Sequence, residues 1–286
     1  MGGSESEGYP CPVKVLVVVD DMINREVATS MLTLIQCQAS EARNGYEAVE
    51  CYADDSFDLI LMDCHMPTLD GYSATRLIRE IESESERRVP IVALIENAST
   101  EAKKQCVDAG MDDCLCMPFT LDSLRDKVIR WTGIKDENIT HPETAPRGLD
   151  QMKSAMSGSR ISKVAEACAV DEILDPGVLE ELRALQANGS SDMFNRVINL
   201  YITSSPELVE SLKTACYANK YEEIRQSAHA LKSSSNNVGA ISLGRYLSEL
   251  EGEAREQMIK DVDGELVKIL REYGLVISAL GKELAL

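Results

Sequence analysis

The chain has 286 residues, of which 44% are hydrophobic, and this length and composition suit two folded domains better than one. Its formal net charge of −19 excludes the basic stripe that nucleic-acid binding requires, so we expect protein partners and no nucleic acid. No apolar run approaches the roughly 18 residues of a membrane-spanning helix. The nine cysteines have no CxxC or Cys/His spacing and are typical of reduced thiols, which predicts a cytoplasmic protein without a membrane segment.

The first part of the chain alternates strand and helix signals after a lead, residues 1–12, that is expected to be flexible. The runs expected to form strands are 13–19, 37–42, 57–62, 89–95 and 113–117. The helical spacings between them fall at 24–36, near 46–52, around 77–81 and at 121–131. This alternation predicts a parallel sheet covered by helices on both faces, over residues 13–132.

Three acidic residues lie at the ends of two of these strands. Asp20 and Asp21 follow the first strand, and Asp63 follows the third. Parallel sheets of this type place their sites at the carboxyl ends of the strands, so the three carboxylates are expected to converge. Acids can simply cap strand ends, but three of them repel one another without a cation. We therefore expect an open Mg²⁺ site, in which Asp63 could also be a nucleophile that forms an aspartyl-phosphate.

Four motifs mark the same strand ends and turns. They read VVVDD at 17–21, NGYEA at 44–48, DLILMDCHMPTLDG at 58–71 and AGMDD at 109–113. Together they closely resemble the receiver domain of two-component signalling. The resemblance implies a flavodoxin-like (βα)5 fold with Asp63 as phosphoacceptor. It also implies that Asp20, Asp21 and Asp63 bind the metal, with the carbonyl of Cys64 completing the metal shell.

Three positions depart from the receiver pattern. That family has a hydroxyl residue at the end of the fourth strand and a lysine before the proline after the fifth, where this chain has Ile95 and Met117; Cys114 replaces a common aromatic residue. Loss of the lysine removes a charge-assisted hydrogen bond worth about 1.5–3 kcal/mol. One interpretation is a degenerate receiver, or pseudo-receiver, that serves as a docking or regulatory module. The other is a receiver in which Asp63 still exchanges phosphate weakly; we favour the first.

Residues 133–172 separate this part from the rest of the chain and contain prolines, glycines and serines. Such a composition is typical of a linker. The piece 149–170 has some helical periodicity, so we expect the linker to be partly helical.

Residues 173–286 show only helical spacing. The first expected helix starts at Asp175, with Pro176 in its first turn, and another covers 191–217 with a kink at Pro206. A later helix bears His229, and the last helical stretch covers 266–286. These patterns predict a helical bundle as the second domain.

His229 lies in the middle of its helix, with Lys232 one turn later. Positions i and i+3 share a helix face, so the Lys232 ammonium can reach oxygens carried by the His229 ring, and the small Ser233 lets a partner approach. A neutral imidazole is a nucleophile near pH 7. The simpler alternative is a solvent-exposed histidine, because a His-x-x-Lys pair alone is a weak signal.

The longer run AHALKSSSNNVGA at 228–240, followed by an amphipathic helix, closely resembles the histidine phosphotransfer (HPt) domain of phosphorelays. The resemblance implies a four-helix bundle in which His229 carries a phosphoryl group between aspartates of receiver domains, with Lys232 stabilising it. One residue departs from the pattern, because the family usually has glycine where this chain has Ser233. We expect a slightly narrower docking surface there, without loss of transfer.

A receiver followed by an HPt domain resembles the C-terminal end of hybrid sensor kinases. The sequence contains no nucleotide-binding kinase module that we can identify, so we expect a phosphotransfer intermediate, either freestanding or a fragment of such a kinase. The expected partners are receiver domains of response regulators or a hybrid sensor kinase. The competing hypothesis is an interaction scaffold in which neither domain is phosphorylated.

Overall fold

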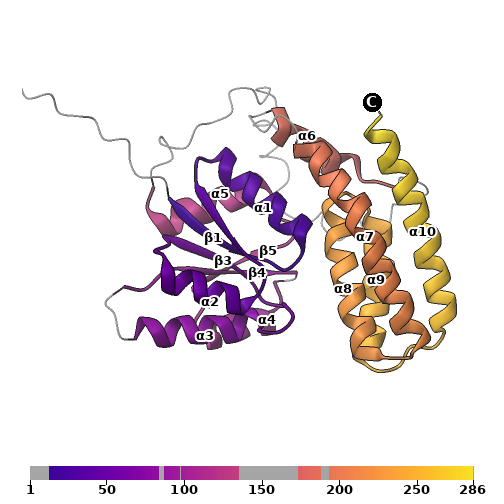
Figure 1. The fold of residues 1–286 in the computed structure, drawn as a ribbon, viewed down its shortest axis with the longest axis horizontal. Helices are drawn as coiled ribbons and strands as arrows, with labels where there is room; N and C mark the ends of the chain where they lie inside the picture. Colours follow the sequence, from indigo (N-terminus) through magenta and orange to yellow (C-terminus); the bar gives the residue numbers. More distant parts are fainter. Residues whose placement is uncertain (1–12, 84–86, 97, 135–172, 188–192, 286) are drawn as a thin grey trace, which may run out of the picture.

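The structure is a computed structural model that describes residues 13–83, 87–96, 98–134, 173–187 and 193–285. Figure 1 shows an α/β part from the N-terminal half of the chain beside a helical bundle from the C-terminal half. The predicted lead and almost all of the predicted linker, including its helical piece, lie outside the described residues. Within those residues, no helix is both long and apolar enough to span a bilayer.

A five-stranded parallel sheet forms the middle of the α/β part, as the alternating pattern predicts. Its strands lie in the order β2-β1-β3-β4-β5. Strands β3 and β4 are buried throughout, which explains their uninterrupted apolar runs, whereas the edge strand β2 is partly exposed. The strands are β1 (Lys14–Val18), β2 (Gln38–Ala42), β3 (Leu59–Asp63), β4 (Ile91–Ile95) and β5 (Asp113–Cys116).

Helices cover both faces of this sheet (Figure 1). Alternate side chains of β1 pack on opposite faces: Val15 and Val17 belong to the core under α1 and α5, and Leu16 and Val18 to the core under α2, α3 and α4. The helices are α1 (Met22–Leu34), α2 (Gly45–Asp54), α3 (Gly71–Glu82), α4 (Thr100–Ala109) and α5 (Leu121–Thr132).

Helix α4 is the α/β helix to which the sequence analysis gave no range. Its apolar face is small, because only Cys106 and Ala109 are buried in it, and the periodic signal is correspondingly weak. Ser99 caps its first turn by accepting a hydrogen bond from the Ala102 amide at 3.1 Å. The first turn of α4 therefore has a defined position beside the site described below.

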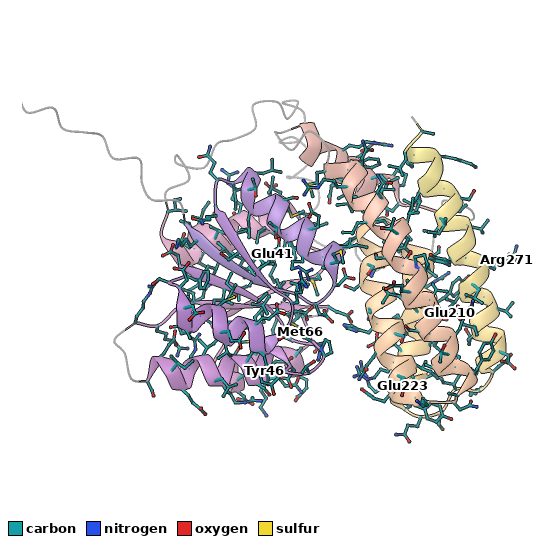
Figure 2. All side chains as sticks on the ribbon, in the orientation of Figure 1. Glu41, Tyr46, Met66, Glu210, Glu223 and Arg271 are labelled. Carbon is teal, nitrogen blue, oxygen red and sulfur yellow. The ribbon has the colours of Figure 1, made fainter. Side chains whose placement is uncertain are left out.

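Among the described residues after 172, five helices form the second part. They are α6 (Pro176–Ala187), α7 (Met193–Tyr217), α8 (Tyr221–Asn237), α9 (Ile241–Arg255) and α10 (Val262–Glu283). Helices α7 to α10 form the predicted four-helix bundle, and α7 continues through Pro206. The fully buried Tyr201 ties α7 to α8, because its hydroxyl lies 2.9 Å from the Ser235 hydroxyl. Side chains fill the space between the elements in both parts (Figure 2).

Candidate functional site

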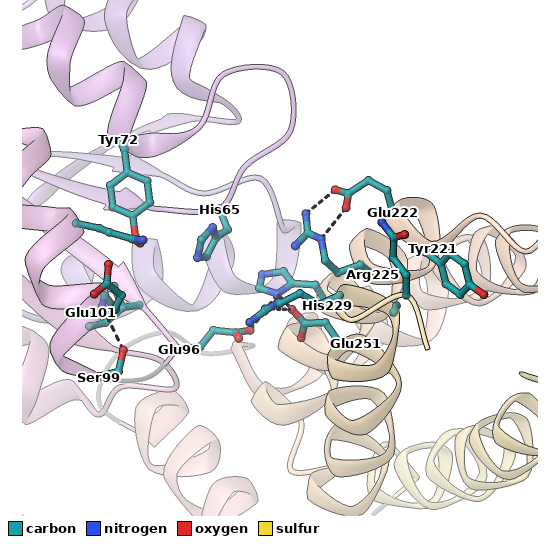
Figure 3. Close-up of a pocket in the computed structure, with 16 residues that line it drawn as sticks. His65, Tyr72, Glu96, Ser99, Glu101, Tyr221, Glu222, Arg225, His229 and Glu251 are labelled. Carbon is teal, nitrogen blue, oxygen red and sulfur yellow. Dashed lines mark hydrogen bonds and ion pairs between the residues drawn. The ribbon is translucent and has the colours of Figure 1, made fainter. Parts of the chain in front are cut away.

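His229 lies on the face of α8 that turns away from the bundle core and toward the receiver-like part (Figure 3). Its side chain is only 17% exposed, so the alternative of a solvent-exposed surface histidine does not hold. The ring meets that of His65, which follows β3, edge to face with 6.0 Å between the centroids. A cavity of about 630 Å³ opens beside the two histidines, between α4 and the ends of α8 and α9.

Two carboxylates lie beside Nδ1 of His229, and one ammonium bridges the two carboxylates. Glu251, from α9, places Oε1 3.2 Å from His229 Nδ1, and its Oε2 accepts a hydrogen bond from Lys232 Nζ at 2.6 Å. Glu96, which follows β4, places Oε1 3.4 Å from the same nitrogen. Its Oε2 also accepts from Lys232 Nζ, at 2.6 Å. The four side chains form one network across two parts of the chain.

This network fixes which nitrogen of His229 is available. An ionised carboxylate can only accept, so Nδ1 carries the proton and Nε2 of a neutral ring keeps its lone pair. Burial works to lower the pKa of His229, but the hydrogen bond to Glu251 and the charge of Glu96 outweigh it and raise the pKa. Burial works to raise the pKa of Glu251, but bonds from His229 and Lys232 lower it to about 2.

Glu96, His229 and Glu251 also have the composition of a metal site. In the part of the chain that the structure describes, they are the group whose donor atoms all lie within 4.8 Å of one another. Lys232, however, already binds an oxygen of each carboxylate at 2.6 Å. A buried ammonium beside both carboxylates opposes a second cation, so we interpret the cluster as an ion-pair network.

The predicted acidic pocket lies at the carboxyl ends of β1 and β3. Asp63 is the last residue of β3, is 4% exposed, and accepts a hydrogen bond from the His65 amide at 2.9 Å. Asp21 caps α1 by accepting from the Asn24 amide at 2.8 Å, and its other oxygen accepts from Ser234 of α8 at 2.6 Å. Asp21 is thus engaged by both parts of the chain.

Electrostatics distinguish Asp20 and Asp63 from ordinary surface acids. Burial, and then the charge of Asp21, raises the pKa of Asp20. Burial also raises the pKa of Asp63, and the charge of Asp20 adds to the effect. Asp63, which is buried, and Asp20, which is partly buried, are acids whose ionised forms are disfavoured, and such carboxylates suit a cation. The carbonyl of Cys64, next in the chain, is a further oxygen, which here accepts a hydrogen bond from the Gly71 amide.

None of the three positions that depart from the receiver pattern has a cationic side chain. Ile95 ends β4 and is 4% exposed. Met117 follows β5, donates its amide to the Ile95 carbonyl at 2.7 Å, and packs its side chain against the apolar core. Cys114 packs, partly buried, against the core on the other face.

Glu251 is the site residue that the sequence analysis missed. It is 4% exposed, between the buried Leu250 and Ala254 of α9. A glutamate one turn after Leu247 on an apolar helix face is a detectable signal, because buried acids are rare unless paired. Glu96, which directly follows β4, was also not identified from the sequence, and it forms ion pairs with Lys232 and His229.

Comparison with known proteins agrees with both parts of the fold. A response regulator receiver domain model matches residues 15–129, and an Hpt domain model matches residues 196–279. Hybrid signal transduction histidine kinase A of Dictyostelium discoideum is 39% identical over 122 residues, which are 42% of this chain and 6% of that protein. Sensor histidine kinase GacS of Pseudomonas protegens is 28% identical over 271 residues, 94% of this chain and 27% of that protein. The chain thus spans a minor part of these relatives.

Solved structures similar to the receiver-like part include two from signalling proteins. One is the co-crystal structure of the Saccharomyces cerevisiae phosphotransfer protein Ypd1 with the receiver domain of Ssk1. The match is 32% identical, covers 43% of this chain and 90% of that chain, and has a TM-score of 0.41. The other is the receiver domain of sensor histidine kinase PA1611 from Pseudomonas aeruginosa with a magnesium ion, at 38% identity, 43% coverage of this chain and 100% of that chain, with a TM-score of 0.40.

Proposed function

Because this chain is a two-component phosphorelay protein, with a receiver domain followed by an Hpt domain, we propose that His229 relays phosphoryl groups between aspartates of partner receivers. The observation that carries this assignment is the fixed ring: Glu251 holds Nδ1 of His229 at 3.2 Å and leaves Nε2 as the nucleophile. Lys232, buried one turn along α8, supplies the cation that stabilises the phosphoryl oxygens.

The transfer step balances with these groups alone. The Nε2 lone pair attacks phosphorus of an aspartyl-phosphate, an N–P bond forms, and the P–O bond to the partner's carboxylate breaks with its electrons on that oxygen. The ring keeps its Nδ1 proton and becomes positive, and the Glu251 carboxylate stabilises that charge. Attack by the carboxylate of the next receiver reverses the step and restores the neutral ring.

The acidic pocket of the receiver suits Mg²⁺. Asp20 and Asp63 would hold the ion with the Cys64 carbonyl, and Asp21 would support it from the first turn of α1. Bound there, the ion would neutralise charge on the oxygens of a phosphoryl group at Asp63. The proposal is supported by the raised pKa values of Asp20 and Asp63, because burial, and for each a neighbouring aspartate, disfavours an ionised form that a cation would stabilise.

The receiver in this chain serves, in our proposal, as a docking or regulatory module. Ile95, Cys114 and Met117 replace the side chains that sense a phosphoryl group in the receiver family, and none of them is ionised or a hydroxyl. One observation favours the alternative of an internal relay between Asp63 and His229. His65 donates its amide to Asp63 and its ring contacts the ring of His229, so the two phosphoacceptor candidates lie on either side of one residue.

The expected partners are receiver domains of response regulators or of a hybrid sensor kinase. The seven cysteines that the structure describes are all free thiols, and reduced thiols are typical of the cytoplasm, where we place the protein in this proposal.

Phosphate incorporation tests the proposal. We expect phosphoramidate to add one phosphoryl group to the native chain, measured by intact mass, and His229→Gln to abolish it. Acetyl phosphate with Mg²⁺, applied to native and Asp63→Asn chains, tests the receiver. A label that depends on Asp63 means that the pocket still accepts phosphate, as an internal relay requires, and no label indicates a docking module. If phosphoramidate does not label the native chain, the phosphotransfer proposal is wrong and the scaffold hypothesis replaces it.

A further inference from the structure

The face of α8 that carries His229 is covered by the chain's own receiver (Figures 1 and 3). Helix α1 supplies much of the contact. Asn24 donates its side-chain amide to Ser233 Oγ at 2.6 Å, and Asn24 Oδ1 accepts from the amide of Asn237. Ser234 donates to Asp21 at 2.6 Å. The residue that departs from the HPt pattern, Ser233, is therefore part of the interface between the two domains.

Glu96 adds the charged contact of this interface. It is the receiver residue directly after β4, and its side chain is 27% exposed. Its carboxylate bridges Lys232 Nζ at 2.6 Å and His229 Nδ1 at 3.4 Å. Both of its partners belong to the relay machinery of the Hpt domain.

We infer that the chain's own receiver occupies the docking surface that outside receivers need, and that Glu96 holds it there by binding Lys232 where a phosphoryl group would bind. The inference rests on the proposed function, since it concerns access to the same histidine. An outside receiver must place its aspartate next to His229, and the ring of His65 already contacts the His229 ring in the docked chain.

The charge of Glu96 links docking of the receiver to phosphorylation of His229. A carboxylate and a phosphoryl group are both anionic oxygen acceptors for an ammonium, so they compete for Lys232. Phosphorylation of His229 therefore favours the undocked chain, in which the phosphohistidine faces outside receivers.

The interface has polar contacts, and buried apolar side chains of both domains, such as Val27 of α1 and Val197 of α7, belong to one continuous cluster. The polar contacts include the hydrogen bonds of Asn24 and Asp21, the Glu96 ion pairs, and an ion pair between Arg196 of α7 and Glu26 of α1. We expect changes at these charged and hydrogen-bonding residues to weaken the docking and to leave the apolar packing of each domain in place.

The test compares Glu96→Gln and Ser233→Gly with the native chain, using the full protein at low ionic strength. Glu101→Gln is the matched control, because Glu101 lines the same cavity and, among the described contacts, touches neither His229 nor Lys232. Two quantities are measured: the radius of gyration by small-angle X-ray scattering, and the rate of His229 labelling by phosphoramidate. We expect Glu96→Gln to raise the undocked fraction and the labelling rate about tenfold, Ser233→Gly to act in the same direction, and the control to do neither.

The two readouts separate this inference from the proposed function. Scattering by Glu96→Gln and Ser233→Gly that matches the native chain overturns the inference, whatever the labelling rate. Expansion in both variants supports it even if no variant is labelled, in which case the phosphotransfer function fails and the docking contact stands. Expansion of Glu101→Gln to the same extent would show a nonspecific effect of net charge and would also overturn the inference.

Discussion

Glu251 is the residue on which the chemistry of His229 depends. Its two oxygens contact His229 and Lys232, so one carboxylate orients the nucleophile and the cation together. A buried acid of this kind is stable only because both partners bind it, since an unpaired charge at 4% exposure would cost several kcal/mol. The residue belongs to the relay site even though it would not touch the transferred phosphorus.

Replacement of Glu251 by Gln tests this role. The His229 pKa should fall, because the variant loses the carboxylate whose bond raises it, and burial then lowers it further. A raised pKa stabilises the fold below the ordinary histidine value and loses that contribution as pH rises through the raised value. We therefore also expect the variant to lose stability relative to the native chain mainly at acidic pH. Titration of the His229 ring by NMR measures the shift, and an unchanged pKa would contradict the assignment.

For Asp63 we expect the opposite effect of ionisation on the stability of the fold. Because burial raises its pKa to about 7, the ionised side chain destabilises the fold; this cost is absent below the unfolded pKa, grows between the unfolded and folded pKa values, and is constant above the folded pKa. Asp63→Asn should therefore stabilise the metal-free protein by about 1–3 kcal/mol at pH 8 and much less at pH 4. Thermal melts at both pH values measure this difference.

Addition of Mg²⁺ provides the control for the Asp63 experiment. The ion should raise the melting temperature of the native chain and leave that of Asp63→Asn nearly unchanged, because only the native pocket has the full carboxylate set. Equal responses of the two chains would remove Asp63 from the proposed metal site.

At the residue scale, the sequence predicts the groups whose spacing is local and leaves out those that come together only in the folded chain. His229 and Lys232 are one helical turn apart, so their pairing can be predicted from α8 alone. Glu96 and Glu251 come from β4 and α9, and no local pattern places them at His229. Ser233 was expected only to narrow the docking surface beside His229. Its hydrogen bond with Asn24 joins two distant helices, so no local pattern predicts it.

At the element scale, the start of α3 positions the loop after Asp63. The Gly71 amide donates to the Cys64 carbonyl at 3.2 Å, and a Cβ at Gly71 would lie 2.1 Å from the Asp63 carbonyl oxygen. No side chain fits there without a backbone shift. The glycine of the DLILMDCHMPTLDG motif therefore has a steric reason to be glycine, independent of any family comparison.

A pair of glycine substitutions tests this packing. Gly71→Ala should destabilise the receiver by about 1–3 kcal/mol, because the backbone of β3 must move. Gly252→Ala, in α9, should stabilise the protein by about 0.5–1 kcal/mol, since nothing lies within 4 Å of its Cβ and alanine favours the helix. Urea unfolding measures both. A neutral Gly71→Ala would mean that the loop after Asp63 tolerates displacement.

Element types were predictable where apolar periodicity is strong, and less so where packing overrides it. Strands β3 and β4 are buried throughout and gave clear apolar runs. In α3, the apolar residues around 77–81 do not all face the core, because Leu77 and Ile81 are 38% and 42% exposed while Ile78 is buried. Helix α4 has only two small buried residues, so its pattern carried almost no periodic signal.

At the scale of the whole molecule, the division into two domains follows from the change in pattern from alternating strands and helices to helices alone. The arrangement of the domains does not follow from any such pattern. Its contacts join Asp21 and Asn24 of α1 to Ser233, Ser234 and Asn237 of α8, residues that are more than 200 positions apart in the chain. Polar side chains on two separate helices give no sign of being partners until both domains are folded.

The docking of α8 on its own receiver has a kinetic consequence. Two sites on one chain meet at an effective concentration that is commonly millimolar for short connections, and a free competitor must match it at equilibrium. An outside receiver at micromolar concentration would therefore seldom displace the tethered one by mass action. The turnover of the relay would then be set by how often the chain opens, and a signal that weakens one hydrogen-bonded contact at Asn24 or Glu96 would change that frequency directly.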